Sequence, residues 1–160
     1  MHVAVPVTAP LRKLDDFLRR AWLECCGHMS AFEIHGQRYA SASMEGESSM
    51  GASLSQVLEV GTKFNYEYDY GSTTDLALKV IALREQDLAK GAIQLLAMNE
   101  PPRIICQRCG IEPATLICTE CAWKGEGWFC EGCAVAHDCG DEMCLPVVNS
   151  PRVGVCGYTG

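Results

Sequence analysis

Residues 106–144 read CQRCGIEPATLICTECAWKGEGWFCEGCAVAHDCGDEMC, and this stretch decides the architecture of the chain. It holds three Cys-x-x-Cys pairs, which are Cys106 with Cys109, Cys118 with Cys121, and Cys130 with Cys133. Eight residues separate each pair from the next. A Cys-x-x-Cys turn points two sulfurs at one metal ion, and a structural zinc ion takes four ligands in a tetrahedron. The spacing therefore predicts a small module that folds around metal.

The three pairs supply six ligands, whereas two closed zinc sites need eight. The nearest further candidates are His137 and Cys139, and Cys144 competes with them for a place. The predicted ligands of two zinc ions are therefore Cys106, Cys109, Cys118, Cys121, Cys130, Cys133, His137 and Cys139. Evenly spaced pairs of this kind are hard to explain as merely buried or redox-active thiols. With so many ligands available, closed structural sites are favoured over a catalytic site, which keeps an open position.

Two pairing orders are compatible with this spacing. In the consecutive order, the first and second pairs share one ion. In the alternating order, the first and third pairs share one ion, and the middle pair joins His137 and Cys139. We favour the alternating, cross-braced order because each eight-residue interval can make a tight excursion. Its rhythm resembles MYND and B-box fingers, although the histidine–cysteine spacing after Cys133 is shorter than theirs.

Cysteine placement and the N-terminal residues together indicate the compartment. The chain has 160 residues and 11 cysteines, nine of them between Cys106 and Cys156 and two adjacent at Cys25 and Cys26. Such density signals disulfides in an oxidising compartment or metal in a reducing one. Residues 1–10 are too short and too interrupted by proline for a signal-peptide core, and no uncharged apolar run approaches the ~20 residues of a membrane helix. We therefore expect a cytoplasmic protein with no membrane partner.

Residues 1–102 are predicted to form an α+β domain. Residues 11–25 carry apolar side chains at three-to-four-residue spacing, which predicts an amphipathic helix capped by Thr8. Residues 63–71, KFNYEYDYG, alternate aromatic and polar side chains and predict the clearest strand. A second alternating run at residues 76–80 predicts its antiparallel partner.

Shorter signals complete the predicted organisation of the chain. They are a strand at 31–34 that turns and returns at Tyr39, a glycine- and serine-rich loop at 41–53, a short helix at 54–60, an apolar strand at 93–97, and a stiff Pro101-Pro102 linker. The predicted fold is thus an antiparallel sheet with one or two packed helices, followed by the cross-braced zinc module at residues 103–160. We expect the tail of that module to pack back on the first domain.

Four segments outside the cysteine pairs are distinctive: WLECCGHMSAF (22–32), YEYDYGSTT (66–74), MNEPP (98–102) and LPVVNSPRVGVCGYTG (145–160). They resemble the plasmid pRiA4b ORF-3-like family, and within it a branch that carries a cysteine-rich insertion before the Asn-Ser-Pro-Arg ending. The resemblance implies an α+β fold and no established activity. It also implies kinship with proteins scattered through bacteria and archaea, some of them passengers of mobile elements.

His28 stands close to Cys25 and Cys26, and a third metal site or a nucleophile–base pair there is one interpretation. Because no fourth ligand is in view, we interpret the three residues as the end of a helix with buried thiols. Asp69 is interpreted as a residue that caps a strand end. An enzyme with a site near His28 and Asp69 stays a second alternative, although the chain lacks a Walker loop and a His-Glu-x-x-His pattern.

The charge balance decides which partner we expect. The formal net charge is −7, and from Arg103 onward four basic residues face seven acidic ones. This disfavours binding to nucleic acid, which depends on Lys and Arg neutralising phosphates. We therefore expect a non-enzymatic zinc-binding protein whose module binds protein, with Trp123 and Trp128 covering the zinc sites. A nucleic-acid-binding accessory protein of a mobile element is the first alternative.

Overall fold

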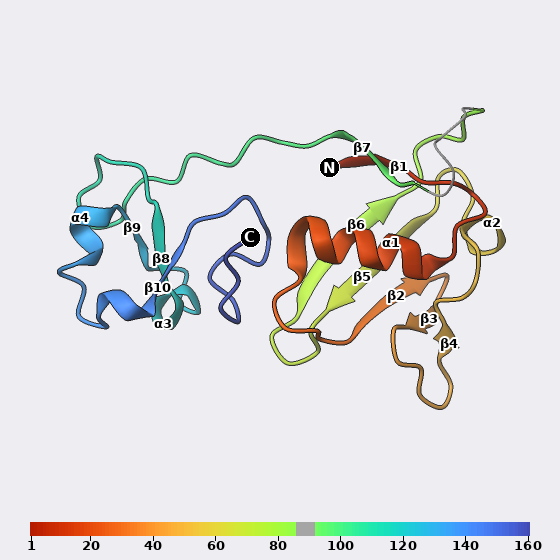
Figure 1. Ribbon diagram of the computed structural model, residues 1–160, viewed down its shortest axis with the longest axis horizontal. Helices are drawn as coiled ribbons and strands as arrows, with labels where there is room; N and C mark the ends of the chain where they lie inside the picture. Colours follow the sequence, from red (N-terminus) through yellow and green to blue (C-terminus); the bar gives the residue numbers. More distant parts are fainter. Residues whose placement is uncertain (86–91) are drawn as a thin grey trace. The chain divides into compact units, whose positions relative to one another are not determined.

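The computed structural model describes residues 1–85 and 92–160, which divide into two compact units (Figure 1). The first unit comprises Met1–Ala21 and Cys26–Asn99, and the second comprises Trp22–Cys25 and Glu100–Gly160. Within the second unit, the C-terminal tail is joined to Trp22–Cys25, because the Ser150 hydroxyl donates a hydrogen bond of 2.5 Å to the carbonyl oxygen of Trp22. Among the described residues, no helix has both the length and the apolar character needed to cross a bilayer.

A five-stranded sheet in the order β4-β3-β2-β5-β6 forms the centre of the first unit. Its strands are β2 (Ser30–Ile34), β3 (Gln37–Ala40), β4 (Ser48–Ser49), β5 (Lys63–Tyr68) and β6 (Thr74–Lys79). Neighbouring strands are antiparallel, apart from the parallel pair of β3 with β4. A separate antiparallel pair joins β1 (His2–Ala4) to β7 (Gln94–Ala97). The α+β class with a largely antiparallel sheet is therefore confirmed.

The tyrosine strand β5 follows its predicted alternation. Phe64, Tyr66 and Tyr68 are buried, and the polar residues between them are not. The alternation stops at Asp69, whose positive φ of 64° is a left-handed conformation that ends the strand. Tyr70 therefore leaves the aromatic face, and its ring lies 4.8 Å beneath the guanidinium of Arg38.

Helix α1 (Leu11–Leu18) lies across the face of the sheet formed by β2, β5 and β6 (Figure 1). Its buried carboxylate, Asp15, accepts hydrogen bonds from Ser30 Oγ at 2.6 Å and from the Tyr66 hydroxyl at 2.7 Å. Burial, the negative charge of Asp15 and this bond raise the pKa of Tyr66. This network fixes the helix on the sheet, because both hydroxyls are satisfied by one buried group.

The ends of this helix differ from the prediction. Thr8 does not cap it; Pro10 is the N-cap and supplies no side-chain bond. The backbone carbonyls of Ala52 and Met50 accept from the first helical N–H groups, at 2.9 and 3.0 Å, and so replace a side-chain cap. The α-helix also ends at Leu18 and continues as a π-helical turn over Arg19–Leu23, so the segment to Cys25 is not one regular helix.

Two further expectations for the first unit are corrected. The predicted loop at 41–53 contains β4, and Met50 within it is fully buried, so the segment packs against the core. Helix α2 (Leu54–Val57) is shorter than predicted because Leu58 is already extended. Its start is as expected: Ser53 and Gln56 form a capping box, with the Ser53 N–H donating to Gln56 Oε1 at 2.9 Å.

The second unit is built on a small antiparallel sheet in the order β10-β8-β9. Its strands are β8 (Leu116–Cys118), β9 (Trp128–Phe129) and β10 (Cys144–Pro146), and its helices are α3 (Thr119–Ala122), α4 (Glu131–Ala134) and a 3-10 turn at Asp141–Met143. One buried cluster of this unit comprises Cys106, Cys118, Phe129 and Ala134, and Leu23, Ile117 and Tyr158 are also buried in the unit. Half of the cluster is cysteine, so apolar burial contributes little to the stability of this part of the unit.

Candidate metal centres

The first group of ligands, which we call site A, gathers Cys106, Cys109, Cys130 and Cys133. All four sulfurs lie within 4.8 Å of one another. Cys106 and Cys109 belong to the turn after Ile105, and Cys130 is the N-cap of α4. Because α4 begins at Glu131, its first turn brings Cys133 to the same side as Cys130.

The second group, site B, gathers Cys118, Cys121, His137 and Cys139, again with the ligand atoms within 4.8 Å. Cys118 ends β8 and caps α3, whose first turn carries Cys121. His137 and Cys139 follow α4 and return to this pair. Sites A and B therefore interleave along the chain, in the alternating order that the spacing favoured.

The separations fit a tetrahedral metal ion. With Zn–S bonds of about 2.3 Å and Zn–N bonds of about 2.1 Å, a tetrahedron has S···S edges of roughly 3.8 Å and S···N edges of roughly 3.5 Å. In site B, the Cys121 sulfur lies 3.8 Å from the Cys139 sulfur and 3.4 Å from Nε2 of His137. In site A, the sulfurs of Cys109 and Cys130 are 4.0 Å apart. An ion can enter either site with little movement of the ligands.

Backbone hydrogen bonds within site A favour the thiolate form of Cys106. Burial raises the pKa of Cys106, but backbone N–H groups, including that of Cys109, donate to its sulfur and together lower this pKa to about 6. The thiol of Cys130, together with burial, raises the pKa of Cys133 to about 12. Like charges in one site oppose each other, so the four thiols cannot all ionise without a central cation.

In site B, as in site A, the pKa of one cysteine is lowered and the pKa of another is raised. Burial raises the pKa of Cys118, and N–H donors led by that of Cys121 lower it below its usual range. Burial and the neighbouring Cys118 thiol raise the pKa of Cys121 to about 12. A divalent ion replaces the shared protons and removes the repulsion between thiolates, which is why binding of zinc to such sites releases protons.

Strand β9 and the neighbouring Gly127 contact the candidate ligands of site B. The ring of Phe129 packs on the imidazole of His137, with centroids 4.5 Å apart and planes inclined by 42°. The N–H of Cys118 donates to the carbonyl oxygen of Gly127 at 2.9 Å. Gly127 comes so close to the ligands that a methyl group there would lie 2.9 Å from the Cβ of Cys121.

Two expectations about neighbouring residues are resolved. Cys144 lies outside both groups, and its sulfur is 3.9 Å from the carbonyl oxygen of Gly140. Trp123 does not cover the sites as predicted, because 69% of its surface is exposed. It sits at the C-cap of α3, where the helix ends and its side chain points to solvent.

A third metal site at Cys25, Cys26 and His28 was one interpretation of the sequence. In the first unit, the sulfur of Cys26 lies 2.9 Å from Nε2 of His28. The thiols near His28 are not buried as expected, since Cys26 is exposed and Cys25 is half-buried. Asp69 does end a strand, but its carboxylate also lies 3.5 Å from Nδ1 of His28.

The two units thus define a protein that joins a helix-on-sheet domain to a cysteine-rich module with grouped metal ligands. The chain belongs to the plasmid pRiA4b ORF-3-like protein family, whose model matches residues 2–102. The matched region ends before the first Cys-x-x-Cys pair, so sites A and B lie outside it. No curated protein and no solved structure matches the chain.

Proposed function

We propose that this chain is a zinc-binding protein in which two closed, structural zinc sites hold the second unit together. The observation that carries the proposal is the pair of interleaved four-ligand groups, sites A and B. Thiolates with at most one imidazole in a tetrahedron are the ligand set of zinc, which takes part in no redox chemistry. Four protein ligands at each ion leave no open position for a substrate, so the role is stability rather than catalysis.

The energetic argument rests on what the second unit lacks. The buried cluster beside the cysteine groups holds Phe129 and Ala134 with two cysteines, and a cluster of this size cannot offset the entropy of ordering residues 106–144. Structural zinc sites in small modules contribute about 10–16 kcal/mol at neutral pH. Zinc binding and folding of this unit should therefore be one process.

We further propose that the module binds another protein. Ile111, Trp123 and Val135 are 73%, 69% and 77% exposed, and large exposed apolar groups are typical of protein contacts. The module's acidic balance, made stronger by thiolates that outnumber the charges of the ions, disfavours nucleic acid. Trp123→Ser should weaken capture of a cellular protein partner, whereas the exposed neighbour Lys124→Ser should not. If both variants capture it like the wild type, this part of the proposal is wrong.

Hydrogen exchange with and without a chelator tests the structural role. Stripping the metal should remove protection from amides of the second unit, such as those of Thr115 and Cys118, which donate to Phe129 and Gly127. Amides of β2 and β5 in the first unit should keep their protection, which provides the internal control. Adding zinc chloride back should restore the lost protection. Unchanged exchange at Thr115 and Cys118 after verified loss of metal would contradict the proposal.

A further inference from the structure

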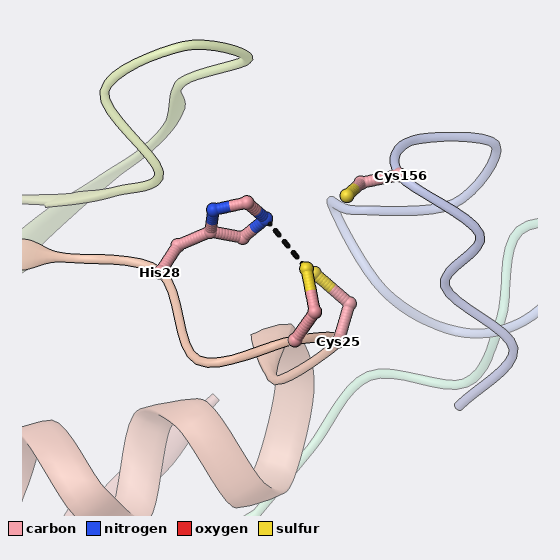
Figure 2. A group of neighbouring side chains, drawn as sticks. Cys25, His28 and Cys156 are labelled. Atoms are coloured by element: carbon pink, nitrogen blue, oxygen red, sulfur yellow. Dashed lines mark hydrogen bonds between the residues drawn. The ribbon is translucent and has the colours of Figure 1, made fainter.

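We propose that Cys26 is an activated thiol that forms a mixed disulfide with small aliphatic disulfides, with His28 as its proton acceptor and Asp69 as a positioning residue. All three residues belong to the first unit. The sulfur of Cys26 lies 2.9 Å from Nε2 of His28, and Nδ1 of the same ring lies 3.5 Å from Asp69 Oδ1. Figure 2 shows the imidazole of His28, with a dashed line from its ring nitrogen to this sulfur. A nucleophile, a base and a third group that orients the base are the arrangement that activates cysteine in enzymes.

The register of two strands brings His28 and Asp69 together. Strands β2 and β5 are antiparallel, and Ser30 lies opposite Tyr68. The residues before β2 and after β5 therefore meet at one end of this strand pair, where the N–H of Asp69 donates to the carbonyl oxygen of Met29 at 2.9 Å. The fold of the first unit thus sets the position of the carboxylate beside the imidazole.

Contacts within the first unit also hold the imidazole of His28. Its edge packs against the ring of Tyr68, with centroids 5.7 Å apart and planes inclined by 82°. The guanidinium carbon of Arg19 lies 5.1 Å from the centroid of the same tyrosine ring, and Arg19 donates a hydrogen bond to the carbonyl oxygen of His28. An imidazole held in this way keeps one nitrogen toward Cys26 and the other toward Asp69. Cys26 itself is exposed, so a small molecule can reach its sulfur.

The carboxylate of Asp69 decides which nitrogen of His28 carries the proton. An ionised carboxylate can only accept, so it favours a proton on Nδ1 and leaves Nε2 to accept the proton of the Cys26 thiol. It also stabilises the imidazolium that then forms. The 3.5 Å between Nδ1 and Oδ1 is longer than a hydrogen bond, and such contacts commonly tighten when a substrate binds.

Exchange with a disulfide is the reaction that these three groups can complete. The thiol of Cys26 gives its proton to Nε2 of His28, and the thiolate attacks one sulfur of the disulfide. A new S–S bond forms as the old one breaks, and the leaving thiolate takes the proton from the imidazolium. Cys26 is thereby oxidised, and half of the disulfide is reduced and released as a thiol. Acyl transfer would in addition need N–H donors aimed at an oxyanion, so a disulfide is the favoured substrate class.

Incubation of the full chain with glutathione disulfide tests the proposal, with the rate of modification at Cys26 followed by mass spectrometry of proteolytic peptides. His28→Asn removes the proton acceptor, and His35→Asn is the matched control, because His35 is an exposed histidine in the turn between β2 and β3. An ordinary thiol is only a few per cent ionised at neutral pH, and the gain from fuller ionisation is partly offset by lower nucleophilicity. Modification of Cys26 should therefore be about 3- to 30-fold slower in His28→Asn than in His35→Asn.

Asp69→Asn tests the positioning role. Asparagine tolerates the left-handed conformation of this position, and its amide oxygen can still accept from the N–H of Gly71, as Oδ1 does at 3.0 Å. The variant should therefore fold normally but react more slowly, because an amide can donate to Nδ1 of His28 and shift the ring proton to Nε2. Nitrogen NMR of the His28 ring reports this change of tautomer, which a merely structural role would not produce.

The outcomes are distinct from those that test sites A and B. Equal rates at Cys26 in His28→Asn and His35→Asn would overturn the proposal, and an unchanged tautomer and rate in Asp69→Asn would overturn the role of Asp69. Loss of Cys26 modification when zinc chloride is added to the wild type, but not to His28→Asn, would also overturn the proposal, since Cys26 and His28 would then be metal ligands. Each of these results leaves the proposed function of sites A and B standing.

Discussion

Replacing Gly127 by alanine should damage site B through a steric clash with its ligands. Gly127 has a φ of 96°, and an added Cβ would lie 2.9 Å from the Cβ of Cys121 and 3.1 Å from the carbonyl oxygen of Cys118. Contacts below 3.0 Å force a shift, and here the obstructing atoms are close to the backbone rather than at the end of a flexible chain. The shift must therefore move the cysteine pair that the ion needs.

Gly125 provides a matched control, two residues earlier in the same turn. It also has a positive φ, 76°, but an added Cβ there meets nothing within 4 Å. Alanine in the left-handed conformation costs roughly 1–2 kcal/mol, and both substitutions carry this cost. Overpacking adds about 1–3 kcal/mol to Gly127→Ala. If this difference falls on the metal-bound state, zinc at site B binds about 5- to 140-fold more weakly than in Gly125→Ala.

Competition with a chromophoric chelator measures this difference directly. The expected titration has one ion released earlier from Gly127→Ala than from Gly125→Ala, which itself binds zinc about 5- to 30-fold more weakly than the wild type because of its left-handed alanine. Equal zinc affinities in the two variants would show that Cys118 and Cys121 are not held by an ion, and the reasoning about site B would be refuted.

Three further substitutions test other parts of the fold. Asp15→Ala should destabilise the first unit by about 2–6 kcal/mol in urea unfolding, because the hydroxyls of Ser30 and Tyr66 lose their shared acceptor; a loss below about 1 kcal/mol would contradict the network. Phe129→Ala should destabilise the second unit by about 3–5 kcal/mol in thermal unfolding, since it removes the ring behind His137; an unchanged midpoint would argue against that packing. Arg38→Ala should change stability by less than about 1 kcal/mol, because its bridges to Glu47 and Glu67 are partly solvated; a larger loss in the same urea assay would mean that they act as a network.

The sequence predicted the features whose cause is local. The regular Cys-x-x-Cys spacing predicted two interleaved groups of candidate ligands, and the structure brings the side chains of each group within 4.8 Å of one another. Strict alternation from Phe64 to Tyr68 gave the central strand, because side chains of a strand alternate between its faces.

Features that depend on distant residues were not predicted. The start of α1 is satisfied by carbonyls near Met50, forty residues away, so Thr8 is not needed as a cap. Trp123 was predicted to cover the zinc sites, but its position at the end of α3 leaves it in solvent. At the start of α1, a tertiary contact decided what the local pattern could not.

The central claim is that zinc, rather than an apolar core, holds the second unit together. The zinc content of the full chain in native mass spectrometry, compared with that of a Cys106→Ser/Cys118→Ser double variant, tests it most directly. These substitutions remove one ligand from site A and one from site B. The account predicts that the wild type carries at least two ions more than the double variant. Equal zinc content in the two proteins, or a wild type without zinc, would contradict it.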